Sequence, residues 1–173
     1  LGWNDERMNM ETNAKKLKFN LLENAIDSLR QGVGFLLKSD SSSNDSDRPE
    51  PSQSDLKLAV MLIAQAIELL LKERLKRKSE ALIFTDDAKI KTVTIGEAQT
   101  KLKIDANVTL SNAEKKIIRD LSQTRNDIQH YEIEISYPNV LSKTDRAIGF
   151  ITRFLHDEGW TSQDLLRFDV KKA

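Results

Sequence analysis

The 173-residue chain contains no cysteine, which excludes both a disulfide framework and catalysis by a thiolate. It has only two histidines, so a zinc site built from histidine and cysteine ligands is not expected. No apolar run approaches the roughly 20 residues that a membrane-spanning helix needs. The 27 basic and 27 acidic residues cancel, which argues against a polycation that coats duplex nucleic acid. We therefore expect no metal, no cofactor and no membrane segment.

The length of the chain suits one domain. Residues 1–12 are polar and lack the basic-then-apolar order of a secretory signal, so a cytoplasmic location is the default expectation. We expect this leader to be disordered or foreign to the native protein, and residues 13–173 to form a single helical domain. A serine-rich stretch, 39–54, has almost nothing apolar to bury and is expected to be a flexible loop.

Apolar residues recur at helical spacing in four long stretches, and this pattern predicts an all-α bundle of four long helices. The first helix is expected over 13–38, with Asn13 as its cap, although Gly32 and Gly34 weaken its last turns. Tertiary packing would have to offset that cost. The second helix is expected over 55–78, with Ser54 as its cap.

The third and fourth helices have clear boundary signals. A capping box at 111–114 predicts the start of the third helix, which should end near His130. The fourth helix is expected over 143–158, between a Ser142 cap and Gly159. The shorter expectations are an apolar segment at 81–84, an extended segment at 90–95, a short helix at 96–103, an extended segment at 131–137 closed by Pro138, and an amphipathic tail at 162–170.

One arginine falls on or beside a helical face that should be buried. Arg125 lies four residues after Leu121, seven after Ile118 and three before Ile128, and these apolar residues mark the inner stripe of the third helix. Burying an unpaired guanidinium costs several kcal/mol. Arg125 is therefore expected to have a carboxylate partner, to face a cleft, or to lie at an interface between chains.

Arg125, Asn126 and His130 supply groups that suit cleavage of RNA without a metal. Imidazole transfers protons near neutral pH, guanidinium binds phosphate and stays charged, and an amide orients hydrogen bonds. The ribose 2′-hydroxyl would attack its own phosphorus, leaving a 2′,3′-cyclic phosphate and a free 5′-hydroxyl. The structural alternatives are a salt bridge from Arg125 to Asp120 or Glu114, and a His130 that only caps the helix end.

Helical spacing limits what one chain can do with these residues. Asn126 and His130 stack on one face, whereas Arg125 and His130 are about 140° apart on an ideal helix. One chain also offers a single histidine here, although efficient cleavage uses both a base and an acid. A two-fold homodimer through the third helix would supply a second histidine and a second arginine. We therefore predict a composite site at a dimer interface.

The chain resembles the HEPN superfamily (higher eukaryotes and prokaryotes nucleotide-binding domains) over roughly residues 15–155. Two stretches carry the resemblance: Ala-Ile-Glu-Leu-Leu-Leu-Lys at 66–72, and Arg-Asn-Asp-Ile-Gln-His at 125–130, which matches an arginine, a polar residue and a histidine four to six positions after the arginine. The resemblance implies a HEPN-like bundle and a metal-independent, dimeric endoribonuclease. It implies RNA as substrate and service in a toxin–antitoxin or phage-defence system, where an antitoxin or other defence protein is a possible partner.

The resemblance also assigns Arg125 and His130 as catalytic, with Asn126 in support. It leaves open a catalytically silent HEPN-type module that binds RNA, a nucleotide or a protein. One branch of the family carries a His-x-Tyr motif in which the tyrosine is nucleotidylated, and this chain departs from it because Tyr131 follows His130 directly. That regulation is not carried over.

Five further residues complete the predicted site. Glu68 is either one half of an exposed i,i+4 pair with Lys72 or a carboxylate that neutralises Arg125. The residues expected to contact substrate are Lys72, Arg119, Gln129 and Tyr131.

Overall fold

The computed structural model describes residues 20–38, 51–86, 88–131 and 134–160. Five α-helices and one 3₁₀ turn follow one another along these residues, and no strand is formed within them. The expectation of an all-α helical bundle is confirmed at this level. The elements are α2 (Leu21–Leu36), α3 (Gln53–Lys78), η2 (Glu80–Ile83), α4 (Ile95–Asp105), α5 (Asn112–His130) and α6 (Tyr137–Asp157).

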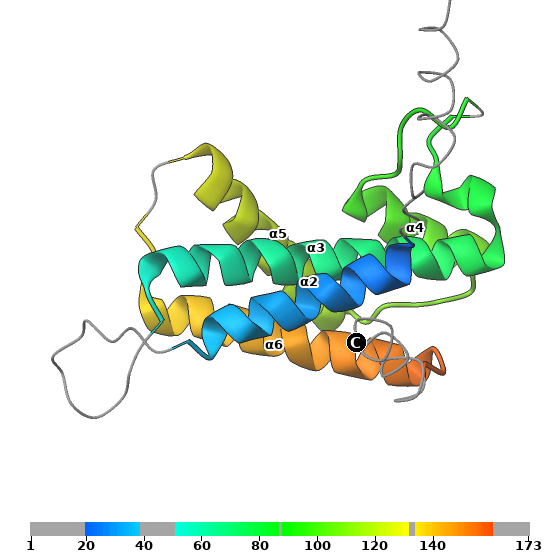
Figure 1. Ribbon diagram of the computed structural model, residues 1–173. Helices are drawn as coiled ribbons and strands as arrows, with labels where there is room; N and C mark the ends of the chain where they lie inside the picture. Colours follow the sequence, from blue (N-terminus) through cyan, green and yellow to red (C-terminus); the bar gives the residue numbers. More distant parts are fainter. Residues whose placement is uncertain (1–19, 39–50, 87, 132–133, 161–173) are drawn as a thin grey trace, which may run out of the picture.

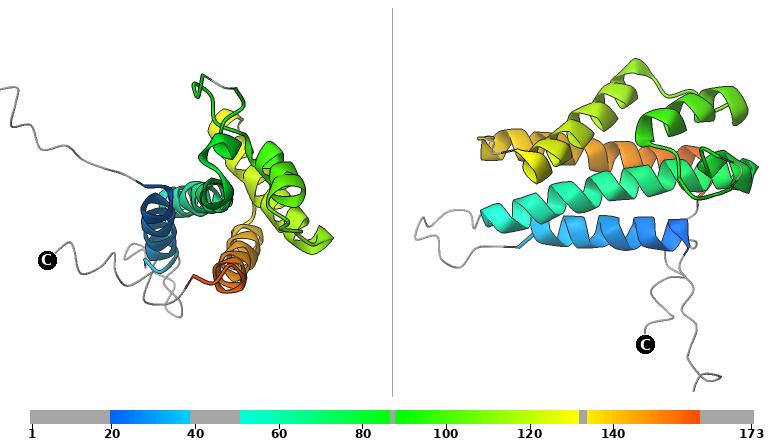
Figure 2. Two further views of the ribbon diagram at one scale, coloured as in Figure 1. Left: turned by 90° about the vertical axis from the view of Figure 1, so that its right-hand side faces the viewer. Right: turned by 90° about the horizontal axis from the view of Figure 1, so that it is seen from above.

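Helix α3 runs through the middle of the bundle and contacts each of the other four helices. Helix α2 lies antiparallel along α3, and α6 runs in the same direction as α3 (Figure 1). Helix α5 crosses α3 obliquely, as the view from above in Figure 2 shows. Its C-terminal half projects beyond α3, near the end at which α3 begins, whereas α4 lies toward the other end (Figure 1).

Buried apolar side chains from all five helices form one cluster. Helix α3 contributes most of its centre: Ile63, Ile67, Leu70 and Leu71 are each at most 1% exposed. Burial of each such side chain stabilises the fold by about 1.5–3 kcal/mol. The packing of α3 therefore fixes the positions from which its few polar residues can reach neighbouring helices.

Gly32 permits close approach of α2 to α3. A Cβ atom added at Gly32 would lie 2.8 Å from Cγ1 of Ile63 and 3.4 Å from the carbonyl oxygen of Ala59. The close packing of the two helices accommodates this glycine, because a Cβ at position 32 would force a shift at Ile63. Gly34 has no atom within 4 Å of such a Cβ and has no comparable role.

Several helix boundaries follow the expected caps. Ser111 and Glu114 form the predicted capping box of α5. Gly159, with φ of 73°, lies just after α6 and adopts the left-handed conformation expected there. A second capping box, formed by Thr94 and Glu97 at the start of α4, was not predicted.

Other boundaries were predicted wrongly. Helix α2 is capped by Asn20 rather than Asn13, and α3 by Ser52 rather than Ser54, so that Ser54 lies inside the helix. Helix α6 begins at Tyr137, six residues before the expected start, and Ser142 lies inside it. The error arose from Pro138, which lies in the first turn of α6, where its missing N–H costs nothing. From the sequence, Pro138 was interpreted as the end of an extended segment rather than as part of the first turn of a helix.

The expected extended segment at 90–95 does not form a strand. It contributes one isolated bridge, between Thr92 and Phe84, and Ile95 already belongs to α4. The leader 1–12, most of the serine-rich stretch (39–50) and the tail 162–170 lie outside the described residues. Among the helices that are described, none combines the length and the apolar character required to cross a bilayer.

Candidate active site

Helix α5 is fixed to the bundle along one side only. Ile118, Leu121 and Thr124 are its buried residues. The Thr124 hydroxyl donates to the carbonyl of Asp120 at 2.9 Å and accepts from Nζ of Lys143 on α6 at 2.8 Å. The helix is therefore anchored through Thr124, one residue before Arg125, while its following turn projects outward.

Arg125 has a carboxylate partner from another helix. Its Nη1 donates to Oε2 of Glu68 at 3.5 Å, and its Nε and Nη2 donate to Oδ1 of Asn126 at 3.2 and 3.0 Å. The Arg125 side chain keeps 26% exposure, so it lies at the edge of the core. The alternatives Asp120 and Glu114 are not its partners: the Asp120 carboxylate accepts from Lys116, and the Glu114 carboxylate accepts from Ser111 at the start of the helix.

These contacts leave part of the guanidinium available. A guanidinium has five N–H donors, and the three hydrogen bonds above use one each of the Nε, Nη1 and Nη2 protons. The two remaining donors of Arg125 have no partner within the described residues. Arg125 is thus oriented by Asn126 and Glu68 and can still donate two hydrogen bonds to an anion.

Glu68 contacts both of the partners that the sequence left open, Lys72 and Arg125. Its Oε1 accepts from Nζ of Lys72 at 2.7 Å, while Oε2 contacts Arg125. The pair with Lys72 is not exposed as expected, because Lys72 is only 7% exposed. Nζ of Lys72 also donates to the Thr92 hydroxyl at 3.0 Å. This placement indicates an internal role for Lys72 rather than direct contact with substrate.

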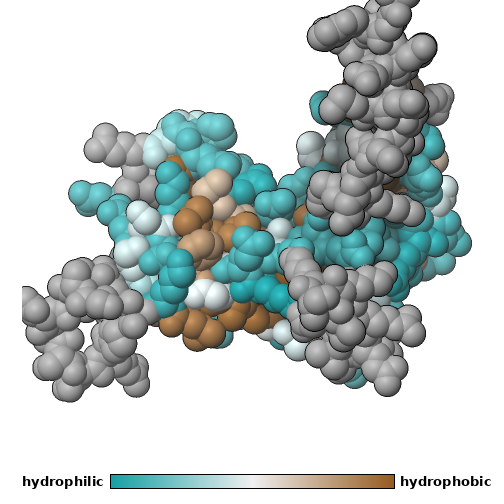
Figure 3. Space-filling model, in the orientation of Figure 1, coloured by the Kyte–Doolittle hydropathy of each residue, from teal (hydrophilic) through white to brown (hydrophobic). Residues whose placement is uncertain are grey.

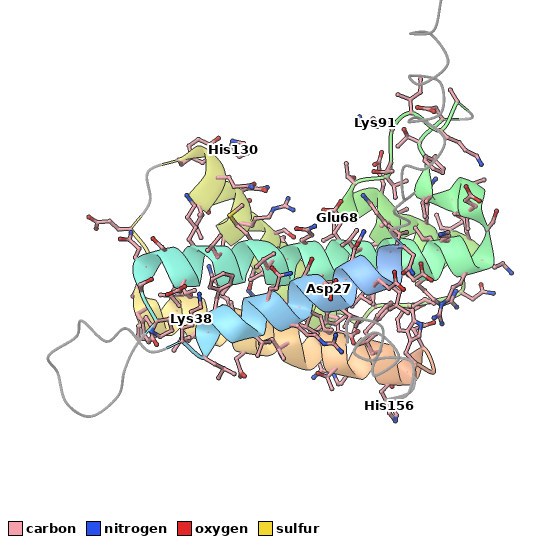
Figure 4. All side chains as sticks on the ribbon, in the orientation of Figure 1. Asp27, Lys38, Glu68, Lys91, His130 and His156 are labelled. Atoms are coloured by element: carbon pink, nitrogen blue, oxygen red, sulfur yellow. The ribbon has the colours of Figure 1, made fainter. Side chains whose placement is uncertain are left out.

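His130 stands apart from this cluster. It is the last residue of α5, is exposed, and makes no hydrogen bond or ion pair to any other described residue. Figure 4 shows His130 at the free end of α5, well away from Glu68 on α3. A single chain therefore gathers Arg125, Asn126 and Glu68 and leaves His130 outside. The helical spacing predicted the separation of Arg125 from His130.

The remaining predicted residues do not join the cluster. Arg119 and Gln129 are exposed on α5, and Tyr131, directly after the helix, is 70% exposed. Tyr131 and Tyr137 line a cavity of about 980 Å³ between the start of α3, the end of α5 and the start of α6. Apolar residues of all three helices, such as Leu56, form its walls.

Sequence reasoning missed Thr92. It lies 20 residues from Lys72 along the chain, in a segment without helical periodicity, and no local pattern links the two. Only a buried lysine in a helix would have signalled that a partner was needed, and burial is not visible in a sequence.

Asp120 is the carboxylate on α5 whose ionisation is clearly perturbed. The hydrogen bond from Lys116 lowers its pKa below the ordinary 3.8, with smaller contributions from the charges of Lys116, Arg119 and Arg146. Asp120 therefore stays ionised as part of a surface pair. In the described ranges, no three histidine or acidic side chains gather as a metal ion would require.

The outward side of α3 is apolar over about one turn. Leu58 is 40% exposed, and Met61 and Leu62 are half-buried, although α3 also buries apolar residues on its inner side. Figure 3 shows apolar surface over α3, between α2 and the projecting end of α5. A helix that is apolar on nearly all sides is ordinarily covered on all sides.

Comparison of the chain with family models, with curated proteins and with solved structures gave no match. The HEPN resemblance therefore remains a prediction that rests on residues 66–72 and 125–130.

Proposed function

We propose that this chain is a metal-independent endoribonuclease that cleaves RNA at a composite site between two copies of the chain. Arg125 binds the scissile phosphate and stabilises the charge that develops on its oxygens. His130 of one copy removes the proton of the 2′-hydroxyl, and the second His130 protonates the departing 5′-oxygen. The products are a 2′,3′-cyclic phosphate and a 5′-hydroxyl, and DNA is not cleaved because it lacks the nucleophile.

The orientation of Arg125 is the observation that carries this proposal. Asn126 and Glu68 hold the guanidinium at the edge of the core with two donors to spare. A held arginine with free donors is the arrangement that recognition of a phosphate needs.

Two features support a homodimer. His130 and Arg125 do not meet within one chain, so a second copy is needed to bring an imidazole to each guanidinium. The outward apolar surface of α3, which includes Leu58, Met61 and Leu62, lies beside the projecting end of α5 and is only partly covered by the described residues. A two-fold contact over this surface and α5 would bury apolar area and bring the two sites together.

Service as a toxin or as a phage-defence nuclease follows from the HEPN resemblance alone. The same holds for an antitoxin or other defence protein as partner. These assignments are proposed together with the activity and depend on it.

A binding-only HEPN-type module is the second candidate. It is favoured by the contact of Glu68 with Arg125, because a carboxylate beside the guanidinium lowers its attraction for phosphate. In that case RNA, a nucleotide or a protein would be bound without cleavage.

Incubation of the purified protein with end-labelled single-stranded RNA and a metal chelator tests the activity. Cleavage should continue in the chelator, and His130→Ala should lower its rate by about 10²–10⁴-fold, the usual contribution of general acid–base catalysis. His156→Ala is the matched control, because His156 is an exposed histidine on α6 whose only described contact is its neighbour Asp157. Tight binding with intact RNA would favour the binding module instead.

A mixing experiment tests the composite site. When wild-type and His130→Ala chains are mixed, their mixed dimer should be nearly inactive, because the proposed site uses the His130 of both copies. A site contained within one chain would leave the wild-type half of each mixed dimer active. Sedimentation of the wild-type chain gives the oligomeric state directly.

A further inference from the structure

The cavity of about 980 Å³ near the free end of α5 has a wall from each of three helices. Figure 1 shows the start of α3, the end of α5 and the start of α6 at the same end of the bundle. Leu56, Ile128 and Val140 line the cavity from α3, α5 and α6, respectively. Leu56 and Ile128 are half-buried and Val140 is 4% exposed, so these walls are part of the packed bundle.

A hydrogen bond holds two of these walls together. Nζ of Lys143 on α6 donates to the Thr124 hydroxyl on α5 at 2.8 Å, and Thr124 is only 2% exposed. Thr124 precedes Ile128 by four residues and Lys143 follows Val140 by three, so each lies about one turn further into the bundle than the cavity. The bond therefore joins α5 and α6 just behind the cavity, and the two walls are held at a fixed separation independently of any ligand.

The lining of the cavity combines aromatic and aliphatic surface with a few polar groups. Tyr131 and Tyr137 contribute aromatic rings, and Lys57 and Glu134 contribute one charge of each sign. The neutral polar residues of the lining are Gln53 and Ser136. Cavities of about 300–1,000 Å³ with mainly apolar walls and a few polar groups are typical of small-molecule sites. This lining suits a group that is flat, uncharged and polar at its edges.

An RNA base has these properties, and the proposed catalytic residues lie next to the cavity along α5. Tyr131 directly follows His130, and Ile128 lies three residues after Arg125 on the same side of the helix. Three residues correspond to a rise of about 4.5 Å. A nucleotide whose phosphate is bound by Arg125 can therefore extend its base, or that of its neighbour, into the cavity. Bases stack on aromatic side chains of proteins that bind single strands, and Tyr131 offers such a ring.

We infer that this cavity is the base-binding subsite of the proposed nuclease, in which a base that adjoins the scissile phosphate stacks on Tyr131. The inference rests on the proposed function, because Arg125 and His130 set the position of the phosphate from which the base extends. It assigns Tyr131 as a residue that recognises the base and Leu56 as part of the apolar wall against which the base packs. The bond between Lys143 and Thr124 positions the walls.

Strands that lack a single base test the inference. The probe is a fluorescent DNA strand with one ribonucleotide, so that cleavage can occur at one phosphate only. Two further strands lack the base either of the ribonucleotide or of the nucleotide that follows it. With the wild-type chain, one of these deletions should lower kcat/KM by about 5- to 150-fold, the usual effect of losing one base–aromatic stack. A deletion several nucleotides away should have little effect.

Three variants locate the base in the cavity. Tyr131→Ala should lower kcat/KM for the complete strand by a similar factor and should no longer distinguish it from the strand without the base. Tyr131→Phe keeps the ring and should restore this distinction. Leu56→Trp fills the cavity with a larger apolar side chain and should behave like Tyr131→Ala. Ile104→Trp, at a 70% exposed position of α4, is the matched control, and thermal melting shows that each variant is folded.

The outcomes separate this inference from the proposed function. If the wild-type chain cleaves all three strands equally well, the base subsite is overturned and the nuclease assignment stands. If anisotropy shows binding that depends on the base and on Tyr131 but no strand is cleaved, the base subsite stands and the nuclease assignment is overturned. If the chain neither binds nor cleaves the strands, both are overturned. If Leu56→Trp dissociates the dimer but leaves the base dependence intact, a second copy occupies the cavity and the base subsite is overturned.

Discussion

Two arginines on contacting helices each meet a glutamate from another part of the chain, and the two pairs are built differently. Arg74 of α3 forms a close ion pair with Glu158, just after α6, and donates to the carbonyl of Ala106 at 3.4 Å. Arg125 of α5 lies 3.5 Å from Glu68 and directs two of its donors to the amide of Asn126.

The difference lies in what each guanidinium holds together. Arg74 connects α3 to the ends of α4 and α6, and its side chain and that of Glu158 are 21% and 15% exposed. Arg125 shares Glu68 with Lys72, so the carboxylate would remain paired without it. We therefore expect Arg74 to stabilise the fold and Arg125 to bind a ligand. A substitution at each position tests this expectation.

Arg125→Ala carries the largest expected effect. Cleavage of RNA should fall by about 10²–10³-fold, the range for removing one group that stabilises charge in the transition state. The melting temperature should change little, because Glu68 keeps Lys72 as its partner. Cleavage assays and calorimetry on the same preparation check both points, with Arg153→Ala, an exposed arginine of α6, as the control. A large loss of stability in Arg125→Ala would contradict the distinction between the two arginines.

Arg74→Ala should show the opposite behaviour. We expect the free energy of unfolding to fall by about 2 kcal/mol, below the 3–5 kcal/mol of a fully buried pair because both partners keep some exposure. Urea unfolding measures this loss, and cleavage per folded molecule should be unchanged. The companion variant Arg77→Ala should cost less, since Arg77 pairs with Glu73 at a more exposed position and stacks on Trp160. Equal losses in the two variants would show that the Glu158 pair has no special structural role.

Glu68→Gln sharpens the comparison at the Arg125 pair. Removing the carboxylate charge should tighten RNA binding about threefold, because part-exposed charge pairs are worth about 0–1 kcal/mol. The rate of the bound complex should nevertheless fall, since Arg125 loses the partner that orients it. Anisotropy and single-turnover kinetics separate the two effects. Weaker RNA binding in Glu68→Gln would argue against an electrostatic opposition between Glu68 and phosphate.

Acidification should have the smallest effect on the stability of the fold, and this effect should be distributed over several carboxylates. Hydrogen bonds from Ser52, Thr94 and Lys116 lower the pKa of Asp55, Glu97 and Asp120, respectively, below their ordinary values of 3.8, 4.5 and 3.8. A depressed pKa in the folded state gives stability that is present above the ordinary pKa and is lost as the pH falls through and below it.

Melting temperatures between pH 6 and pH 3 should therefore decline mainly below about pH 4.5. Asp120→Asn should be slightly less stable than the wild type at pH 6 and should lose less stability on acidification. If the melting temperature already declines well above pH 5, titratable groups other than these carboxylates are responsible.

Short sequence patterns predicted the first residues of some helices correctly and those of other helices wrongly. The capping box at Ser111 located the start of α5 because its hydrogen bonds involve residues three apart, a spacing visible in any sequence. Pro138 was misread because proline both begins and ends helices, and the choice depends on whether the following residues pack. The start of α6 is thus set by burial of Val140 and Thr144.

The candidate site likewise combines features that the sequence predicts with features that it does not predict. The position of Arg125 at the edge of the apolar stripe, and its separation from His130 by about 140°, follow from helical periodicity. The choice of Glu68 over Asp120 and Glu114 does not, since 57 residues separate Arg125 from Glu68 along the chain. The packing of α5 across α3 makes that choice.

The order of residues alone determined that this chain is helical, where α5 begins, and that an arginine would stand at the margin of its core. These properties depend on hydrogen bonds and side-chain spacings within a few residues. Only the tertiary structure decided that Lys72 would be buried, that Thr92 would meet it, and that Glu68 would contact both Lys72 and Arg125. Such contacts join distant segments, and they exist because α3 packs against every other helix and thereby fixes where each one lies.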